Sequence, residues 1–477
     1  MADADIDLLG VRLGSVTAPA GCGKTQLIAS TLARCAEDKP VLVLTHTNAG
    51  VAALRGRLDR LGISAKRYRL STIDGWSMRL IATFPARSGV DPDALMLRDP
   101  RRDYPAIRDA AHALLESGHV NDVLVATYSR IIVDEYQDCS VPQHFIVGYA
   151  STVLPTCVLG DPLQTIFDFK GVAMPDWDKD VRAHFPEIGV LSEPWRWIRA
   201  GTEHLGHWLL DVRGKLLRQE AIDLRDAPAE VTWVHLDGTD DEKLRLAAAR
   251  TNGSTADDKV LVIGYSTKPA LQQDFARRTP GAQAIEAVDL KDLIHFAGRL
   301  NLHHADALDI VAHFAQSVMS NVGAADYIRR VDSLRRGTAR LAASAAERAG
   351  LNFIAAPSYG GVADVLVEIG KTPGVIAYRS GMLRACLKAL QLSHASGGAV
   401  SFHDAAINVR EQSRLLGRSL PKRAIGSNLL LKGLEGEVAV ILDADELDAR
   451  HLYVSMTRGS KSLVICSKSQ VLNPYAN

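Results

Sequence analysis

Residues Ala18 to Thr25 read APAGCGKT and stand between a β-branched run and a helical stretch, QLIASTLARCA. Small residues in this context let backbone amides close around phosphate groups, and the helix N-terminus adds its positive dipole. Lys24 is placed to reach the β and γ phosphates of a nucleoside triphosphate, and the Thr25 hydroxyl to ligate Mg²⁺. The segment therefore predicts a phosphate-binding loop. Its residues are Ala18, Ala20, Gly21, Cys22, Gly23, Lys24 and Thr25.

A pair of carboxylates follows a second apolar run in IIVDEYQD, residues 131 to 138. Asp134 is placed to hold Mg²⁺, usually through water, and Glu135 to polarise the attacking water. The alternative is a solvated acidic turn after a buried strand. Because the pair follows a phosphate loop, the two motifs together favour nucleotide hydrolysis.

The elements that carry these motifs alternate between short apolar runs and helical stretches, which predicts an α/β fold with parallel sheets. Ligands of such sheets bind at the carboxyl ends of the strands. Strands are expected at Val11–Thr17, Val41–Thr45, Arg130–Val133 and Thr156–Leu159, and in a second lobe at Lys259–Tyr265, Val438–Asp443 and Ser462–Cys466.

The chain is expected to form two lobes, each with an insertion. The first lobe comprises residues 1–79 and 124–235, and residues 80–123 form a small helical insertion. The second lobe comprises 259–284 and 421–477, after a polar connection at 236–259. Residues 285–420 form a mostly helical inserted domain, with a strand expected at 375–380.

Composition sets limits on the class of protein. With 477 residues, 47% hydrophobic and 23% charged, the chain is neither one small domain nor disordered. Lys plus Arg and Asp plus Glu are both 55, so no global positive field draws the chain to a polyanion. The six cysteines include no CxxC pair, the N-terminus is acidic, and no run of 18 apolar residues occurs. These features predict a cytoplasmic protein without a membrane partner.

VDEYQD, followed about 20 residues later by LGDPLQTIF, resembles the UvrD/Rep-like superfamily 1 DNA helicases, and the resemblance runs in order from residue 18 to about 466. It implies two RecA-like P-loop NTPase lobes with ATP between them. It also implies an ATP-dependent helicase or translocase that moves 3′ to 5′ on single-stranded DNA. The expected partners are single-stranded DNA or a duplex with a 3′ tail, and the expected cofactors are ATP and Mg²⁺.

The resemblance assigns further residues to the nucleotide. In LGDPLQTIF the glutamine senses the γ phosphate, LSEPWRW supplies an arginine for that phosphate and a tryptophan for adenine, and LYVSMTRG supplies an arginine finger. An arginine between two tryptophans can equally form a cation–π packing cluster. The implied residues are Gln164, Trp195, Arg196, Glu435 and Arg458, with Gln26 beside the base.

The resemblance also implies contacts with DNA. THTNAGVAAL, STIDGW and LLLKGLEGEVAVI resemble DNA-contacting motifs, and the aromatics of LQTIFDFKG match residues on which bases stack. Without that motif, two aromatics spaced two apart on a strand would be interpreted as one face of a core. The implied residues are Thr47, Asn48, Thr72, Phe167, Phe169 and Lys432.

The segment 408–432 carries an excess of basic residues, which are Arg410, Arg414, Arg418, Lys422, Arg423 and Lys432 against Glu411. One interpretation is a surface that follows a DNA backbone. The other is a solvated helix face.

A second function remains open beside the helicase. Compact chains of this kind resemble the helicase-like subunit of Gabija-type anti-phage defence systems, which works with a separate nuclease. That resemblance implies an ATPase subunit that senses DNA ends without unwinding, with a nuclease partner. A third possibility, a P-loop NTPase acting on a small molecule, is disfavoured by LYVSMTRG at 452–459.

Overall fold

The computed structural model describes residues 6–167, 173–265, 268–287, 289–416 and 420–475. By internal contacts the chain divides into two compact units. The first comprises residues 1–233, 444–463 and 467–477, and the second comprises 234–443 and 464–466. This division groups residues 444–463 and 467–477 with the first unit, whereas the sequence analysis assigns 421–477 to the second lobe. The lobe and insertion boundaries stay a prediction.

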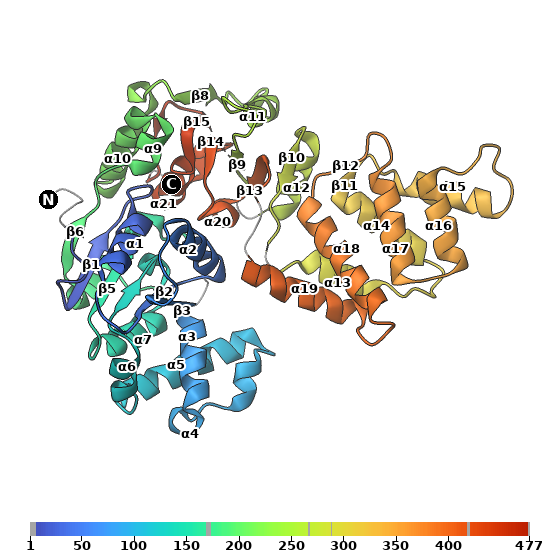
Figure 1. Cartoon of the computed structure of the whole chain (residues 1–477). Helices are drawn as coiled ribbons and strands as arrows, with labels where there is room; N and C mark the ends of the chain where they lie inside the picture. The colour runs from blue at the N-terminus through green and yellow to red at the C-terminus, as the bar shows by residue number, and fades with distance from the viewer. Residues whose placement is uncertain (1–5, 168–172, 266–267, 288, 417–419, 476–477) are drawn as a thin grey trace. The chain divides into compact units, whose positions relative to one another are not determined.

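The first unit is built on a six-stranded sheet of order β3-β2-β4-β5-β1-β6 (Figure 1). All five of its strand pairings are parallel. β5 therefore separates the strand before the phosphate loop from the strand before the carboxylate pair. The strands are β1 (Leu13–Thr17), β2 (Val41–Thr45), β3 (Tyr68–Thr72), β4 (Ile131–Val133), β5 (Thr156–Gly160) and β6 (Glu187–Val190).

Both faces of the central strands β2 and β4 are buried, which is why these two strands are continuous apolar runs. Val41 and Val43 of β2 pack with helices α1 and α2 on one face. Leu42 and Leu44 pack with α3, α5 and α7 on the other. The helices of the first unit are α1 (Lys24–Arg34), α2 (Asn48–Arg60), α3 (Ile73–Thr83), α4 (Pro85–Ser88), α5 (Pro100–Glu116), α6 (Asn121–Thr127), α7 (Val141–Ser151), α8 (Arg182–His184), α9 (Trp195–Ala200), α10 (Glu203–Leu217) and α21 (Ala449–Met456). A two-stranded sheet pairs β7 (Ile222–Asp223) with β16 (Val471–Leu472).

A second six-stranded sheet has the order β10-β13-β9-β14-β15-β8. Its pairings of β10 with β13, β13 with β9 and β9 with β14 are parallel. The strands are β8 (Val231–His235), β9 (Val260–Ile263), β10 (Ala282–Ala284), β13 (Arg423–Gly426), β14 (Gly436–Ile441) and β15 (Gly459–Ser467). The expected α/β class with two parallel sheets is confirmed.

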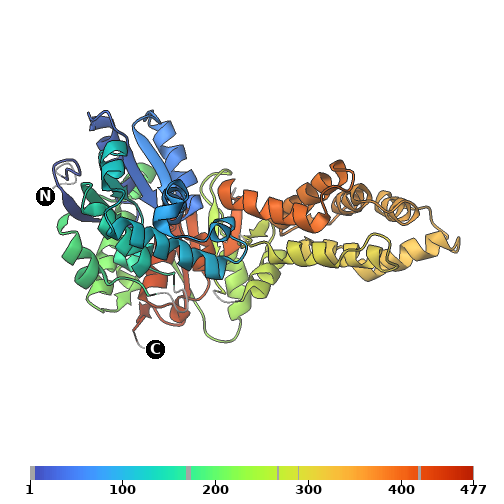
Figure 2. The ribbon, with the colours of Figure 1, turned by 90° about the horizontal axis from the view of Figure 1, so that it is seen from below.

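In the second unit, the segment of the chain that connects β10 to β13 is mostly helical. Its helices share one apolar core, and both views show the yellow and orange helices packed side by side (Figures 1 and 2). The segment expected to be a strand at 375–380 contains the two-residue β12 (Ile376–Ala377), which pairs with β11 (Met319–Ser320). The helices of the second unit are α11 (Asp241–Ala249), α12 (Pro269–Arg278), α13 (Lys291–Arg299), α14 (Ala307–Val318), α15 (Ala324–Arg335), α16 (Ala345–Ala355), α17 (Tyr359–Gly370), α18 (Ser380–Ala395), α19 (Phe402–Leu416) and α20 (Asn428–Leu431).

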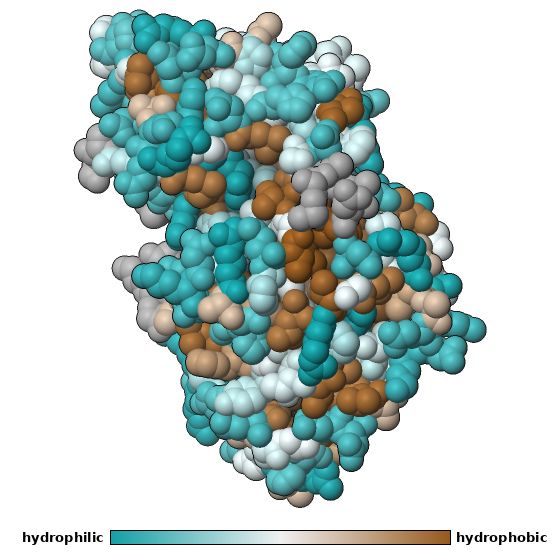
Figure 3. Space-filling view, turned by 90° about the vertical axis from the view of Figure 1, so that its left-hand side faces the viewer, coloured by the Kyte–Doolittle hydropathy of each residue, from teal (hydrophilic) through white to brown (hydrophobic). Residues whose placement is uncertain are grey.

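The surface is polar with scattered apolar residues. On the face drawn in Figure 3, hydrophobic residues form small groups among hydrophilic ones. Exposed large apolar residues of the first unit lie on several elements, including Val123, Phe145, Val190 and Leu217. None of the helices in the described ranges is long and apolar enough to cross a membrane.

Candidate nucleotide site

The phosphate loop runs from the end of β1 at Thr17 to the start of α1 at Lys24. Gly21 and Gly23 have φ values of +73° and +89°, in the left-handed region that favours glycine. Space imposes the same choice, because a Cβ on Gly21 would lie 2.5 Å from Cζ3 of Trp197. The conformation of the loop therefore requires glycine at these two positions.

The carboxylates of Asp134 and Glu135 lie close to the ammonium of Lys24 in the phosphate loop. Lys24 Nζ lies 2.6 Å from Oε1 of Glu135 and 3.3 Å from Oδ1 of Asp134. Both carboxylates directly follow β4, and Glu135 has a left-handed φ of +55°. Its backbone N–H donates to Oδ1 of Asp134 at 3.0 Å. The predicted catalytic lysine and carboxylates are thus brought together at the carboxyl ends of β1 and β4.

Burial and the neighbouring charges have opposite effects on the pKa values of Lys24 and Asp134. Burial alone would lower the pKa of Lys24, but attraction to Asp134 and Glu135 outweighs it, so the pKa of the ammonium is raised. Burial, with the neighbouring Glu135, raises the pKa of Asp134 despite the attraction of Lys24. The protonated form of Lys24 is therefore stabilised, whereas the charged form of Asp134 is disfavoured by its burial.

The donor set fits a Mg²⁺-bound nucleoside triphosphate. Oxygen ligands suit Mg²⁺, which usually keeps several waters and shares its shell with phosphates. In the described ranges no three His, Cys, Asp or Glu side chains form a metal site by themselves. Asp134 and the Thr25 hydroxyl can supply two oxygens, and Thr25 Oγ1 now accepts from Nη1 of Arg57 at 3.0 Å.

The predicted arginine segment lies against the phosphate loop. The backbone N–H of Arg196 donates to the carbonyl of Gly21 at 3.1 Å, and a Cβ on Gly23 would lie 3.0 Å from the indole of Trp195. The Arg196 guanidinium donates to the carbonyl of Thr457 at 2.6 Å and lies 5.3 Å from the Trp197 ring centroid. The cation–π contact is present, in a segment that borders the nucleotide loop.

The segment 452–459 also reaches the loop within the first unit. Ala20 donates its backbone N–H to Oη of Tyr453 at 3.2 Å, and burial raises the pKa of this phenol well above its usual range. Arg458 is 3% exposed, and its Nε donates to the carbonyl of Val454 at 2.8 Å. The predicted finger therefore stands just after α21, and its guanidinium folds back onto the last turn of that helix, which also carries Tyr453.

Gln164 occupies a single 3₁₀ turn, η4 (Pro162–Gln164), after β5. Its side-chain Nε2 donates to Oδ2 of Asp161 at 3.2 Å, and the residue is 7% exposed. Gln26 is exposed on α1. In the second unit, Lys432 ends α20 and Glu435 is exposed just before β14.

The predicted DNA residues of the first unit gather at neighbouring strand ends. Thr47 and Thr72 cap α2 and α3, accepting the backbone N–H of the residue three positions on. They follow β2 and β3, which pair in parallel. Asn48 is exposed beside Thr47, and the Phe167 ring lies 5.8 Å from that of His46. Phe169 lies outside the described residues.

Part of the basic segment is engaged within the second unit. Arg410 pairs with Glu411 at 2.7 Å, and Lys422 donates to the carbonyl of Ala256 at 3.0 Å. Arg423 donates to Oδ1 of Asn252 at 2.7 Å. Arg418 and the side chain of Arg414 lie outside the described residues. Neither interpretation of this segment is decided by these contacts.

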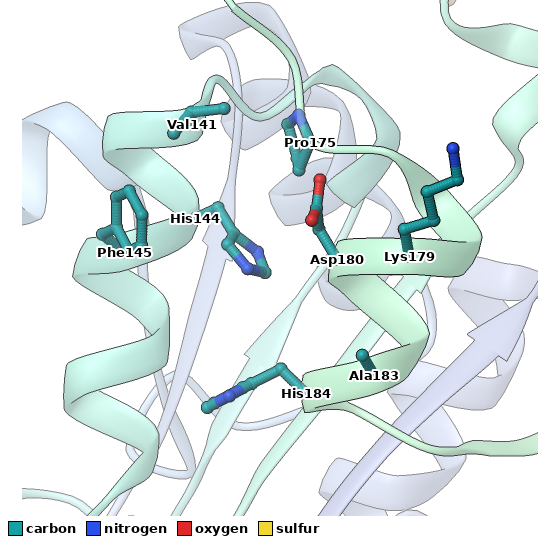
Figure 4. A pocket seen from close by; sticks show the side chains of 8 residues that line it. All are labelled: Val141, His144, Phe145, Pro175, Lys179, Asp180, Ala183 and His184. Carbon is teal, nitrogen blue, oxygen red and sulfur yellow. The ribbon is translucent and has the colours of Figure 1, made fainter.

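A separate pocket of about 390 Å³ lies between α7 and the segment 177–184. His144 and His184 project into it from the two sides (Figure 4). His144 Nδ1 lies 2.8 Å from Oη of Tyr136, and His184 Nε2 lies 2.9 Å from Oγ of Ser151. Burial, with His184 nearby, lowers the pKa of His144. None of the predicted site residues lines this pocket.

Some residues of the site escaped the sequence analysis. The motifs VDEYQD, LGDPLQTIF and LYVSMTRG contain Gln137, Asp161 and Tyr453, so the sequence could have indicated these three residues. Arg57 and Arg213 stand in no motif, and both reach the site from helices that are distant in sequence.

Comparison with known proteins gives a sequence match and a number of structural likenesses, including those to two helicases. Residues 6–170 match the model of an AAA domain. No curated protein is detectably similar to the chain in sequence. The complex of arterivirus nonstructural protein 10, a helicase, with DNA has 13% identity and a TM-score of 0.27 over 54% of this chain and 53% of that one. The chain thus spans about half the length of that helicase.

The Pif1 helicase from Candida albicans has 10% identity and a TM-score of 0.39, over 98% of this chain and 94% of that one. TM-scores of this size do not support any inference about function. The AAA match, in contrast, covers both the phosphate loop and the carboxylate pair. Residues 6–170 therefore contain a P-loop NTPase site of the kind that uses ATP and Mg²⁺.

Proposed function

We propose that the protein is an ATP-dependent DNA helicase or translocase of the UvrD/Rep-like type, which couples ATP hydrolysis to 3′ to 5′ movement on single-stranded DNA. The observation that carries the proposal is the contact of Lys24 with Glu135 and Asp134 at the ends of two strands of one parallel sheet. The AAA match over residues 6–170 supports the nucleotide part.

Each side chain has a defined task in hydrolysis. Lys24 and the loop amides bind the β and γ phosphates, and Thr25 and Asp134 hold Mg²⁺, which neutralises charge on the transferring phosphoryl group. Glu135 accepts the proton of the attacking water. Arg196 and Arg458 stabilise the developing negative charge, and each needs a side-chain rotation away from its present carbonyl partner.

The DNA part rests on the strand ends beside the nucleotide. Thr47, Asn48 and Thr72 stand at the ends of the adjacent strands β2 and β3, and Phe167 lies close to the same loop through His46. Stacking of a base on an aromatic ring contributes about 1–3 kcal/mol and tolerates any sequence. Single-stranded DNA is therefore the proposed track; in the second unit, Lys432 is proposed to bind DNA and Glu435 to bind the nucleotide.

The first test is steady-state ATP hydrolysis with and without single-stranded DNA at low salt. Lys24→Ala and Glu135→Gln should both abolish turnover, but only Lys24→Ala should weaken nucleotide binding, because Glu135 acts on the water and Lys24 on the phosphates. Equal loss of binding in both variants would contradict these roles.

Unwinding of forked duplexes tests the finer proposal. A 3′-tailed duplex should be opened and a 5′-tailed one left intact. Stimulation of hydrolysis by DNA ends without unwinding of either substrate would instead support the DNA-end-sensing ATPase subunit, and addition of a candidate nuclease partner would be the next measurement. Hydrolysis indifferent to DNA would reject both.

A further inference from the structure

An ion pair between Arg213 and Asp161 lies inside the first unit. Arg213 stands on α10, and its Nη2 and Nε approach Oδ1 of Asp161 at 2.9 and 3.3 Å. The Asp161 side chain is fully buried, and that of Arg213 is 11% exposed. Burial would lower the pKa of Arg213, but attraction to Asp161 outweighs it and the pKa is raised. The charged guanidinium is therefore stabilised by Asp161 in a nearly dry setting.

The two carboxylate oxygens of Asp161 accept hydrogen bonds from different groups. Oδ1 accepts from Arg213 and from the backbone N–H of Leu163 at 3.3 Å, which caps the turn η4. Oδ2 accepts from Nε2 of Gln164 at 3.2 Å. Because the guanidinium fixes Oδ1, rotation of the carboxylate is blocked and Oδ2 stays directed at Gln164, the residue proposed to sense the γ phosphate.

The backbone of Asp161 extends the same network to the carboxylate pair. Its N–H donates to Oε1 of Gln137 at 3.2 Å, and Nε2 of Gln137 donates to Oε2 of Glu135 at 2.5 Å. The Gln137 amide is thus held at one end by the backbone of Asp161, directly after β5, and at the other by the proposed catalytic carboxylate. Displacement of Asp161 affects Gln164 and Glu135 together.

We propose that Arg213 is a positioning residue for ATP hydrolysis, which fixes Asp161 so that Asp161 orients Gln164 and, through Gln137, Glu135. This role rests on the proposed function. Arg213 lies outside every motif from which that function was inferred, and its side-chain hydrogen bonds go to Asp161, although Cys22 of the phosphate loop and Tyr453 also act on its charge. Its effect should therefore fall on the chemical step and not on the binding of nucleotide.

The test compares Arg213→Gln with Lys215→Gln, a matched control on the same helix whose ammonium pairs with Asp211 at 3.2 Å. We expect Arg213→Gln to lower kcat at least tenfold, with the Kd for a non-hydrolysable ATP analogue within threefold of wild type. Lys215→Gln should stay within twofold in both. Arg213→Lys, which keeps the charge but not the two-nitrogen contact, should be intermediate.

A second variant separates positioning from folding. Arg213→Gln leaves the buried Asp161 charge unpaired and can lower the melting temperature. The double variant Arg213→Gln/Asp161→Asn removes both charges and should recover much of the melting temperature. We expect its kcat to remain at least tenfold low, because an amide cannot replace both oxygens as acceptors.

Three results would overturn the assignment. An unchanged kcat in Arg213→Gln, or recovery of kcat together with melting temperature in the double variant, rejects Arg213 as a positioning residue and leaves the proposed function intact. Absence of ATP hydrolysis by the wild-type chain, measured against Lys24→Ala as the blank, rejects the proposed function and the role of Arg213 with it.

Discussion

The Lys24 ammonium stands between two carboxylates, so its replacement and that of one carboxylate should change the stability of the nucleotide-free protein in opposite directions. Lys24→Met removes the ammonium that lies between Asp134 and Glu135. Loss of one partner of a buried pair costs about 3–5 kcal/mol. Glu135 is 34% exposed, which weakens the effect. We therefore expect a loss of about 2–3 kcal/mol.

Asp134→Asn should have the opposite effect. It leaves one ammonium facing one carboxylate, and it removes an ionised group whose raised pKa shows that the folded protein disfavours its charge. Replacement of a whole buried ion pair by neutral groups is often neutral or stabilising by about 1–4 kcal/mol; here only one carboxylate is removed and Glu135 still pairs with Lys24, so we expect a gain of at most about 1 kcal/mol. The same variant should lose Mg²⁺-dependent hydrolysis, so stability and activity are opposed at this residue.

Thermal melting in EDTA without nucleotide measures both effects. For a unit of this size 1 kcal/mol corresponds to about 2–4 °C, so Lys24→Met should melt roughly 5–10 °C lower and Asp134→Asn a few degrees higher. Because the pKa of Asp134 is raised in the folded protein, ionisation of this group destabilises the fold. The stability advantage of Asp134→Asn should therefore vanish near pH 4, where Asp134 is protonated, and should grow as pH rises through the folded-state pKa. Shifts of the same sign in the two variants would refute this electrostatic account.

Three other substitutions test separate contacts. Gly21→Ala should cost about 1–2 kcal/mol for its left-handed backbone alone, with a further loss from the clash with Trp197, and should weaken ATP binding in titration calorimetry. Tyr453→Phe leaves the buried N–H of Ala20 without its acceptor, at about 1–3 kcal/mol in chemical denaturation. Phe167→Ala should reduce stimulation of hydrolysis by single-stranded DNA and spare the basal rate; loss of the basal rate would assign the ring to the core.

Strands β1, β2, β4 and β5 of the first sheet were predictable from local apolar runs, whereas β3 and β6, which read YRLST and EIGV, were not. Parallel strands buried on both faces require continuous apolar runs, and the expected Val41–Thr45 coincides with β2. The contact of Lys24 with Asp134 and Glu135 was also predictable, since both motifs directly follow strands that end at one edge of the sheet. The strand within the helical insertion was overestimated, because VIAYRS has β propensity but only two of its residues find a partner strand.

The network around Asp161 was not predictable, because its members are joined by packing and not by spacing. Arg213 is 52 residues from Asp161, and Tyr453 is 433 from Ala20. In sequence, Arg213 is one more charged residue on an amphipathic helix, and solvation is the default for such a residue. Whether its guanidinium is buried depends on how α10 packs against the turn after β5. Motifs thus identify the groups that touch the nucleotide, whereas the groups that hold those residues in place depend on the tertiary structure.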